Sequence, residues 1–102
     1  MDAETFDKQK YVDLFPQLQQ TYKSVFNRMN EEYDSTLIHG IDQQVLNESE
    51  PFYDDEAGEF YVEVPEEPYQ RLTAISVAED RFNAVLETYL DELEAELERT
   101  FG

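Results

Sequence analysis

Carboxylate side chains dominate this chain, because 25 aspartates and glutamates stand against 7 lysines and arginines and leave a net charge of -18 over 102 residues. Repulsion between so many like charges opposes any compact state. Seven tyrosines and seven phenylalanines act in the opposite direction, since large aromatic side chains bury much apolar surface when they pack. A chain of this length fits one domain with a modest core. We therefore expect a single acidic domain over residues 1–102.

Salt reconciles the charge with folding. At about 1 M ionic strength the Debye length is about 3 Å, so exposed carboxylates largely stop repelling one another. We interpret the acidic excess as adaptation to a salt-rich cell interior. The alternative is an ordinary acidic interaction protein, or a chain that stays partly disordered until it binds a partner.

The absence of cysteine excludes disulfides and thiolate zinc sites. The first residues lack the basic and apolar parts of a signal peptide, and no apolar run reaches the length of a membrane span. We expect a cytoplasmic protein that does not bind membranes. Seven scattered basic residues cannot form a phosphate-neutralising patch, so direct binding of nucleic acid is also excluded.

Helical spacing of apolar residues predicts two N-terminal helices, one from Pro16 to Tyr33 and one from Leu37 to Leu46. Pro16 suits a first helical turn, whereas Gly40 weakens the second helix. A preceding helical turn over 11–15 is expected to pack Val12 and Phe15 on the next element.

A β-hairpin is predicted in the acidic middle of the chain. Phe60, Val62 and Val64 alternate with polar or exposed positions, which is typical of a half-buried strand. The turn-forming run 54–58 separates this strand from an upstream one that contains Phe52. A third short strand is possible over 72–77, although residues 69–72 also suit a helical turn.

A long amphipathic C-terminal helix is expected from about Val77 to Thr100, opened by a capping box of Ser76 and Glu79. The fold class is therefore α+β. Four leucines on this helix follow a 4-3-4 spacing, which suits either packing on the hairpin or a homodimer through the C-terminal helix. These are Leu86, Leu90, Leu93 and Leu97.

Two stretches, residues 42–53 (DQQVLNESEPFY) and 68–73 (PYQRLT), resemble a family of small uncharacterised proteins from halophilic archaea. The likeness extends over the whole chain and implies a haloarchaeal cytoplasm. The family has no assigned function, so the resemblance implies no catalytic or binding residue. Ala78 departs from the pattern, in which an acidic helix cap is expected.

A polar face of the second helix is the candidate binding site. His39, the only histidine, shares this face with Gln43 and Asn47, and Asp42 lies one turn away. Gln44 adds to the amide-rich surface. The same residues also suit a plain solvated face, and one histidine without a nearby nucleophile defines no reaction. We predict no catalytic residue, no metal site and no cofactor.

Two acidic clusters invite a second interpretation. The turn with Asp54, Asp55, Glu56 and Glu59 offers oxygen ligands for a divalent cation, but its spacing is not that of an EF-hand and favours a solvated turn. The stripe of Glu87, Asp91, Glu94 and Glu98 along the last helix raises the idea of nucleic-acid mimicry, although a solvated face explains it more simply.

These observations favour a non-enzymatic protein-binding or regulatory module with an unknown protein partner. The alternatives are a small ligand-binding protein or hydrolase that uses His39 and nearby carboxylates, or an acidic mimic of nucleic acid.

Overall fold

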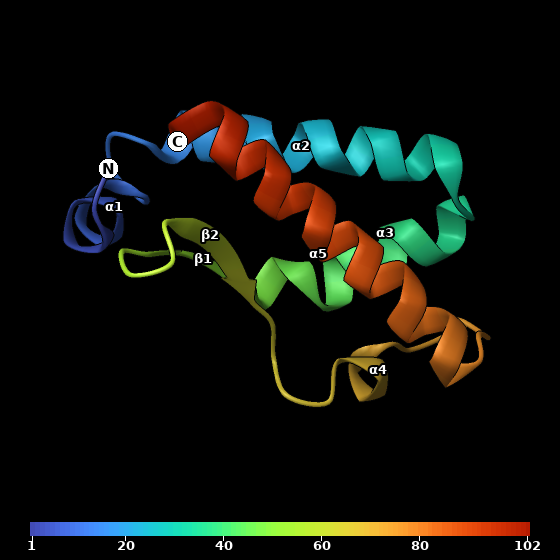
Figure 1. Ribbon diagram of the computed structural model, residues 1–102. Coiled ribbons are helices and arrows are strands. Elements are labelled where there is room, and N and C mark those ends of the chain that lie inside the picture. The colour runs from blue at the N-terminus through green and yellow to red at the C-terminus, as the bar shows by residue number, and fades with distance from the viewer.

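The computed structural model describes all of residues 1–102 and shows helices around a two-stranded antiparallel hairpin (Figure 1). The elements are α1 (Ala3–Gln9), α2 (Phe15–Glu32), α3 (Ser35–Gln44), the 3-10 turn η1 (Leu46–Glu48), β1 (Glu50–Asp54), β2 (Glu59–Glu63), α4 (Pro68–Arg71) and α5 (Glu79–Phe101). The predicted α+β class is confirmed.

The two long helices α2 and α5 pack against each other; α5 runs diagonally through the middle of the molecule, and α2 lies along one side of it (Figure 1). α3 runs back along α2, while the hairpin packs against α5 through β2 and against α1 through β1. Both chain ends lie at the same end of the molecule, where the ring of Phe6 in α1 lies 5.7 Å from that of Phe101 in α5. None of the helices combines the length and the apolar character needed to cross a membrane.

The two predicted N-terminal helices are present as α2 and α3, with boundaries close to the expected ones. Pro16 lies in the first turn of α2, and the Asp34 carboxylate caps α3 by accepting a 2.9 Å hydrogen bond from the backbone N–H of Thr36. The structure adds α1, which the apolar pattern did not predict because Phe6 is its only buried residue. Asp2 caps this short helix on the N–H of Thr5 at 2.7 Å.

The hairpin has the predicted strands, and Tyr53 pairs with Phe60. One face carries Phe60 and Val62 into the core, and the other carries the stacked rings of Phe52 and Tyr61, 5.4 Å apart. Gly58 closes the turn at φ +66°, in the left-handed region that favours glycine.

No third strand forms over 72–77, so this part of the prediction is wrong. The chain instead makes the single helical turn α4 and then an irregular segment in which Ala74 adopts φ +62°. The segment packs its apolar side chains on α3: Leu72 and Ile75 lie directly over Gly40. The side chain of Gln44 supplies the hydrogen bonds that a neighbouring strand would have given.

The long C-terminal helix is confirmed, but α5 begins at Glu79 rather than near Val77 and lacks the predicted capping box. Ala78 occupies the cap position, where no side chain hydrogen-bonds to the first turn. Ser76 therefore lies too far upstream to reach the first free N–H groups.

Nearly every element contributes buried side chains to one hydrophobic core, and the leucines of α5 belong to this core. Leu86, Leu93 and Leu97 are buried within this chain, and Leu90 packs at the edge of the same core. Most of the 4-3-4 row is therefore already covered by the protein's own side chains.

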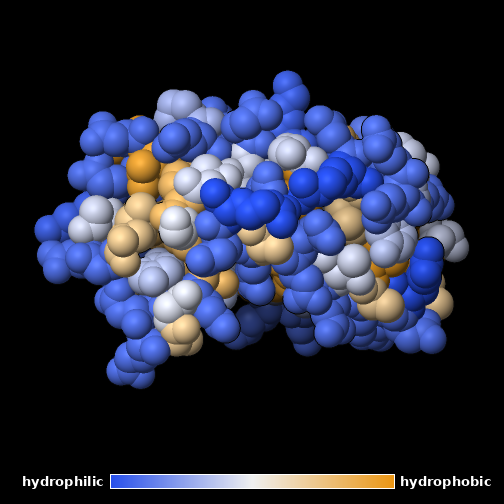
Figure 2. Space-filling model, turned by 45° about the horizontal axis from the view of Figure 1, so that its top comes forward, coloured by the Kyte–Doolittle hydropathy of each residue, from blue (hydrophilic) through white to orange (hydrophobic).

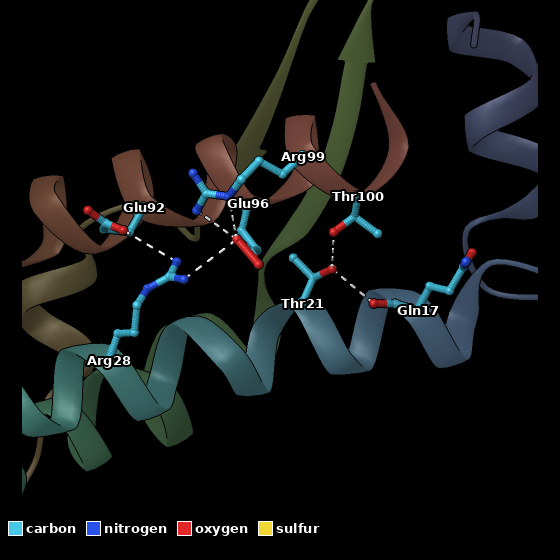
Figure 3. Close-up of polar contacts among 7 residues, drawn as sticks. All are labelled: Gln17, Thr21, Arg28, Glu92, Glu96, Arg99 and Thr100. Atoms are coloured by element: carbon cyan, nitrogen blue, oxygen red, sulfur yellow. Dashed lines mark hydrogen bonds and ion pairs between the residues drawn. The ribbon is translucent and has the colours of Figure 1, made fainter.

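Polar contacts tie α2 to α5 along one flank (Figure 3). Arg28 lies between Glu92 and Glu96, with nitrogen–oxygen distances of 3.4 and 3.6 Å. Glu96 accepts a 2.8 Å hydrogen bond from Arg99, and this bond, together with the positive charges of Arg99 and Arg28, lowers the pKa of its carboxyl group. On the face drawn in Figure 2 much of the surface is hydrophilic, and apolar side chains gather most at the left of the view.

Candidate functional site

A groove of about 640 Å³ lies between α2 and the α3–η1 segment. One wall is largely aromatic and comes from α2 and the chain just before it, while the other carries polar side chains. The lining residues are Tyr11, Phe15, Leu18, Gln19, Tyr22, Lys23, Phe26, Asp42, Gln43, Leu46, Asn47, Ser49 and Pro51.

The aromatic wall follows from helical spacing. Phe15, Leu18, Tyr22 and Phe26 stand at i, i+3, i+7 and i+11, so they form a row along one side of α2. Val25 and neighbouring residues face the core on the adjacent side of the helix. The apolar stripe of α2 is thus wide enough to serve both the core and the groove.

The mouth of the groove holds two exposed aromatic rings. Tyr11 is 52% exposed and Phe15 is 39% exposed, and their rings meet edge to face at 6.1 Å. Val12 beside them is 66% exposed. The prediction that Val12 and Phe15 pack on the next element is therefore wrong: Val12 is exposed in the turn before α2, and Phe15, the first residue of α2, lies at the open mouth of the groove.

A tyrosine hydroxyl marks the inner part of the groove. The hydroxyl of Tyr22 lies 3.3 Å from the hydroxyl of Ser49. Burial raises the pKa of Tyr22 to about 12. Ser49 in turn donates to the carbonyl of Leu46 at 2.6 Å. These contacts link Ser49, the residue that follows η1, to α2 on one side and to Leu46 on the other.

Asp42 is the one carboxylate in the lining, and it is half-buried. Burial raises the pKa of its carboxyl group, against a smaller lowering by the nearby His39. No donor hydrogen-bonds to it, and no basic side chain lies within ion-pair distance. The groove therefore contains a negative charge without a partner.

Lys23 is the one cation in the lining. Lys23 and Arg81 are the two basic side chains, out of seven, with no carboxylate within 4.0 Å. Lys23 lies on the exposed side of α2. Its ammonium is therefore a solvated charge on the rim of the groove.

Three of the five predicted binding residues lie together in the groove: Asp42, Gln43 and Asn47. His39 lies outside it. Its Nδ1 is 3.0 Å from the carbonyl of Ser35, and its ring meets that of Phe26 at 5.0 Å.

Gln44 faces a smaller polar cleft on the other side of α3, together with Glu48, Arg71 and Thr73. The side-chain carbonyl of Gln44 accepts a hydrogen bond from the backbone N–H of Thr73, and Arg71 forms an ion pair with Glu48. Gln43 and Asn47 line this cleft as well as the groove.

The aromatic residues of the groove were missed as functional candidates from the sequence. The available signal was the width of the apolar stripe, since Tyr22 and Phe26 extend it beyond what the core-facing side of one helix needs.

The acidic turn of the hairpin makes backbone contacts. The Asp54 carboxylate accepts from the N–H groups of Glu56 and Ala57, and that of Asp55 accepts from the N–H of Ala3 at 2.8 Å. No group of three or more histidine, aspartate or glutamate side chains is arranged to hold a metal ion. Glu94 of the acidic stripe accepts a 3.2 Å hydrogen bond from the N–H of Val62.

Comparison with known proteins gave one match. The family model described as "Family of unknown function (DUF5783)" covers residues 1–102. No curated protein and no solved structure matches the chain.

Proposed function

The chain belongs to a family of unknown function, and from the groove we propose that it is a non-enzymatic protein-binding module whose partner docks between α2 and α3. One observation carries the proposal: a preformed groove with two aromatic rings exposed at its mouth, in a chain whose net charge is -18. We further propose that the module works in a salt-rich cytoplasm, because a net charge of -18 calls for screening.

The composition of the groove supports protein binding. Tyrosine is enriched at the centres of protein interfaces, where it combines apolar area with a hydrogen-bonding group. Tyr11 and Tyr22 both line the groove, and the amides of Gln43 and Asn47 add hydrogen-bonding groups at its polar wall. A volume of about 640 Å³ accommodates several side chains of a partner segment.

The hydrolase alternative is less well supported by the same geometry. Ser35 Oγ lies 3.4 Å from His39 Nδ1, which resembles a nucleophile and its base. The same Nδ1 is 3.0 Å from the Ser35 carbonyl, and a nitrogen that donates its proton there cannot accept one from the hydroxyl. Both side chains are exposed, and neither lines the groove.

The test compares two exposed aromatic residues with equal exposure. Phe15 at the mouth of the groove and Tyr61 on the outer face of the hairpin are each 39% exposed. The variants are Phe15→Ser and Tyr61→Ser, and both are first checked for an unchanged thermal midpoint. Each variant and the original protein are then immobilised, and the proteins that each retains from a cell extract in molar KCl are compared.

We expect a defined protein to be retained by the original chain and by Tyr61→Ser, and to be lost with Phe15→Ser. A photo-crosslinking residue in place of Gln19, which also lines the groove, should label the same protein. Equal retention by both variants would contradict docking in the groove.

A further inference from the structure

We propose that the groove binds a basic segment of the partner protein and that an arginine or lysine side chain of this segment lies against Asp42. The inference rests on the proposed function and names the chemistry of the partner. Three features support it: the charge of Asp42, the aromatic rings of α2 that line the groove, and the negative net charge of the whole molecule.

The charge comes from Asp42. Its carboxylate is half-buried in the wall of the groove without an ion pair or a hydrogen bond, and burial raises its pKa. A partly desolvated carboxylate is stabilised when a cation donates hydrogen bonds to it. No cation of this chain pairs with it: five of the seven basic side chains are paired with other carboxylates, and neither Lys23 nor Arg81 lies within 4.0 Å of any carboxylate.

The ring surfaces come from α2. Phe15, Tyr22 and Phe26 line the groove opposite Asp42. The methylene stem of arginine or lysine packs well on such surfaces, and its charged end gains from the face of an aromatic ring. Rings on one wall and a carboxylate on the other match the two parts of a long basic side chain.

The field of the whole molecule favours the same partner. At low ionic strength a net charge of -18 attracts a basic segment and repels an acidic one, which raises the rate of encounter, whereas in molar salt only the direct contact with Asp42 keeps this preference. Lys23 is the one residue of the groove whose charge would repel a basic segment. It lies exposed on the rim, whereas Asp42 is half-buried. The opposite occupant, an acidic segment that pairs with Lys23, is an outcome of the test.

The experiment uses three matched pentapeptides, acetylated and amidated, with leucine on both sides of a central arginine, norleucine or glutamate. Each is titrated into the isotopically labelled full-length protein, and amide shifts in the groove and on the hairpin are followed. The variants are Asp42→Asn, which keeps the shape and removes the charge, and Asp91→Asn, which removes one charge from the exposed side of α5.

We expect the arginine peptide to shift groove signals and to bind about tenfold more tightly than the norleucine peptide, as a charge-assisted hydrogen bond implies. Asp42→Asn should abolish this preference and Asp91→Asn should retain it. Equal binding of the arginine and norleucine peptides would overturn the inference but leave the groove as a docking site. Tighter binding of the glutamate peptide would assign the groove to an acidic partner. If no peptide shifts groove signals, both the inference and the proposed function fail.

Discussion

The side-chain carbonyl of Gln44 accepts two hydrogen bonds from Thr73, one from its backbone N–H at 2.6 Å and one from its hydroxyl at 3.0 Å. These bonds join α3 to a segment 29 residues further along the chain. They give Gln44, which the sequence placed in a binding surface, a clear structural contact.

Replacing this glutamine should release the segment that it holds. In Gln44→Ala the N–H of Thr73 loses its acceptor, and a single such bond is worth about 1 kcal/mol. We expect faster hydrogen exchange across residues 72–77 and little change in α5. Gln43→Ala, which removes an exposed amide from the same helix, is the control. Equal exchange in the two variants would contradict the anchoring role.

Gly40→Ala should destabilise the protein, although the same change usually stabilises a helix. A Cβ at position 40 would overlap Cδ1 of Ile75 and lie 3.3 Å from Cδ2 of Leu72. Overpacking of this kind costs about 1–3 kcal/mol, more than the gain of about 0.5–1 kcal/mol in helix propensity. Urea unfolding gives the comparison. The double variant with Ile75→Ala should recover much of the loss, and strictly additive effects would show that the two sites do not touch.

Lys10→Met should cost far more stability than Lys8→Met, although both remove one positive charge. The Lys10 ammonium donates to the Pro51 carbonyl at 2.9 Å, pairs with Glu50 at 2.8 Å and lies 4.0 Å from the centre of the Phe52 ring. The side chain is only 3% exposed, so we expect a loss of about 1–3 kcal/mol in urea unfolding.

The matched control is an exposed ion pair. Lys8 and its partner Glu4 have side chains 68% and 78% exposed, and such a pair contributes roughly 0–1 kcal/mol. Similar losses in the two variants would mean that net charge, rather than the buried contacts of Lys10, decides the effect.

Asp42→Asn should raise stability at neutral pH. Because the pKa of Asp42 is raised in the folded chain, its charged form opposes folding, and this cost appears as the pH rises above the ordinary value of 3.8. The gain should be smaller than about 1 kcal/mol, since the group is partly exposed, and it should vanish below that pH. Thermal midpoints at several pH values test this. A gain that persists at the lowest pH would require another cause.

Salt should stabilise the protein strongly. Between about 0.1 M and about 1 M the Debye length falls from about 10 Å to about 3 Å, which removes most of the repulsion among exposed carboxylates. We expect the thermal midpoint to rise steeply with KCl, and much less with sucrose at equal osmolality, because sucrose strengthens burial without screening charge. A salt-indifferent midpoint would contradict the interpretation of the charge.

Patterns with a regular period were predictable from the sequence. The stripes of α2, α3 and α5 and the alternation of Phe60 and Val62 each repeat often enough to identify an element. α1 was not predicted, because it buries only one side chain and so shows no periodic pattern. The irregular course of residues 72–77 was not predicted either, because it depends on contacts with Gly40 and Gln44 in a distant part of the chain.

The candidate site was predictable in part for the same reason. Asp42, Gln43 and Asn47 share a helix face and so were found together. The opposite wall could not be placed, because the sequence does not show against which helix the polar face lies. Tyr22 and Phe26 belong to the apolar stripe of the predicted helix, and only the packing of α3 on α2 places them along a groove.

On each outer edge of the hairpin a charged side chain hydrogen-bonds to a backbone group that points away from the other strand. Where Pro51 faces Val62, the ammonium of Lys10 meets the outward carbonyl of β1 and the carboxylate of Glu94 meets the outward N–H of β2. Proline itself removes a further donor from the β1 edge. A strand from another molecule would have to displace Lys10 to pair with the β1 edge, or Glu94 to pair with the β2 edge, at this position. The smallest possible sheet is thereby protected from edge-to-edge aggregation, which matters most where salt has weakened the repulsion between copies.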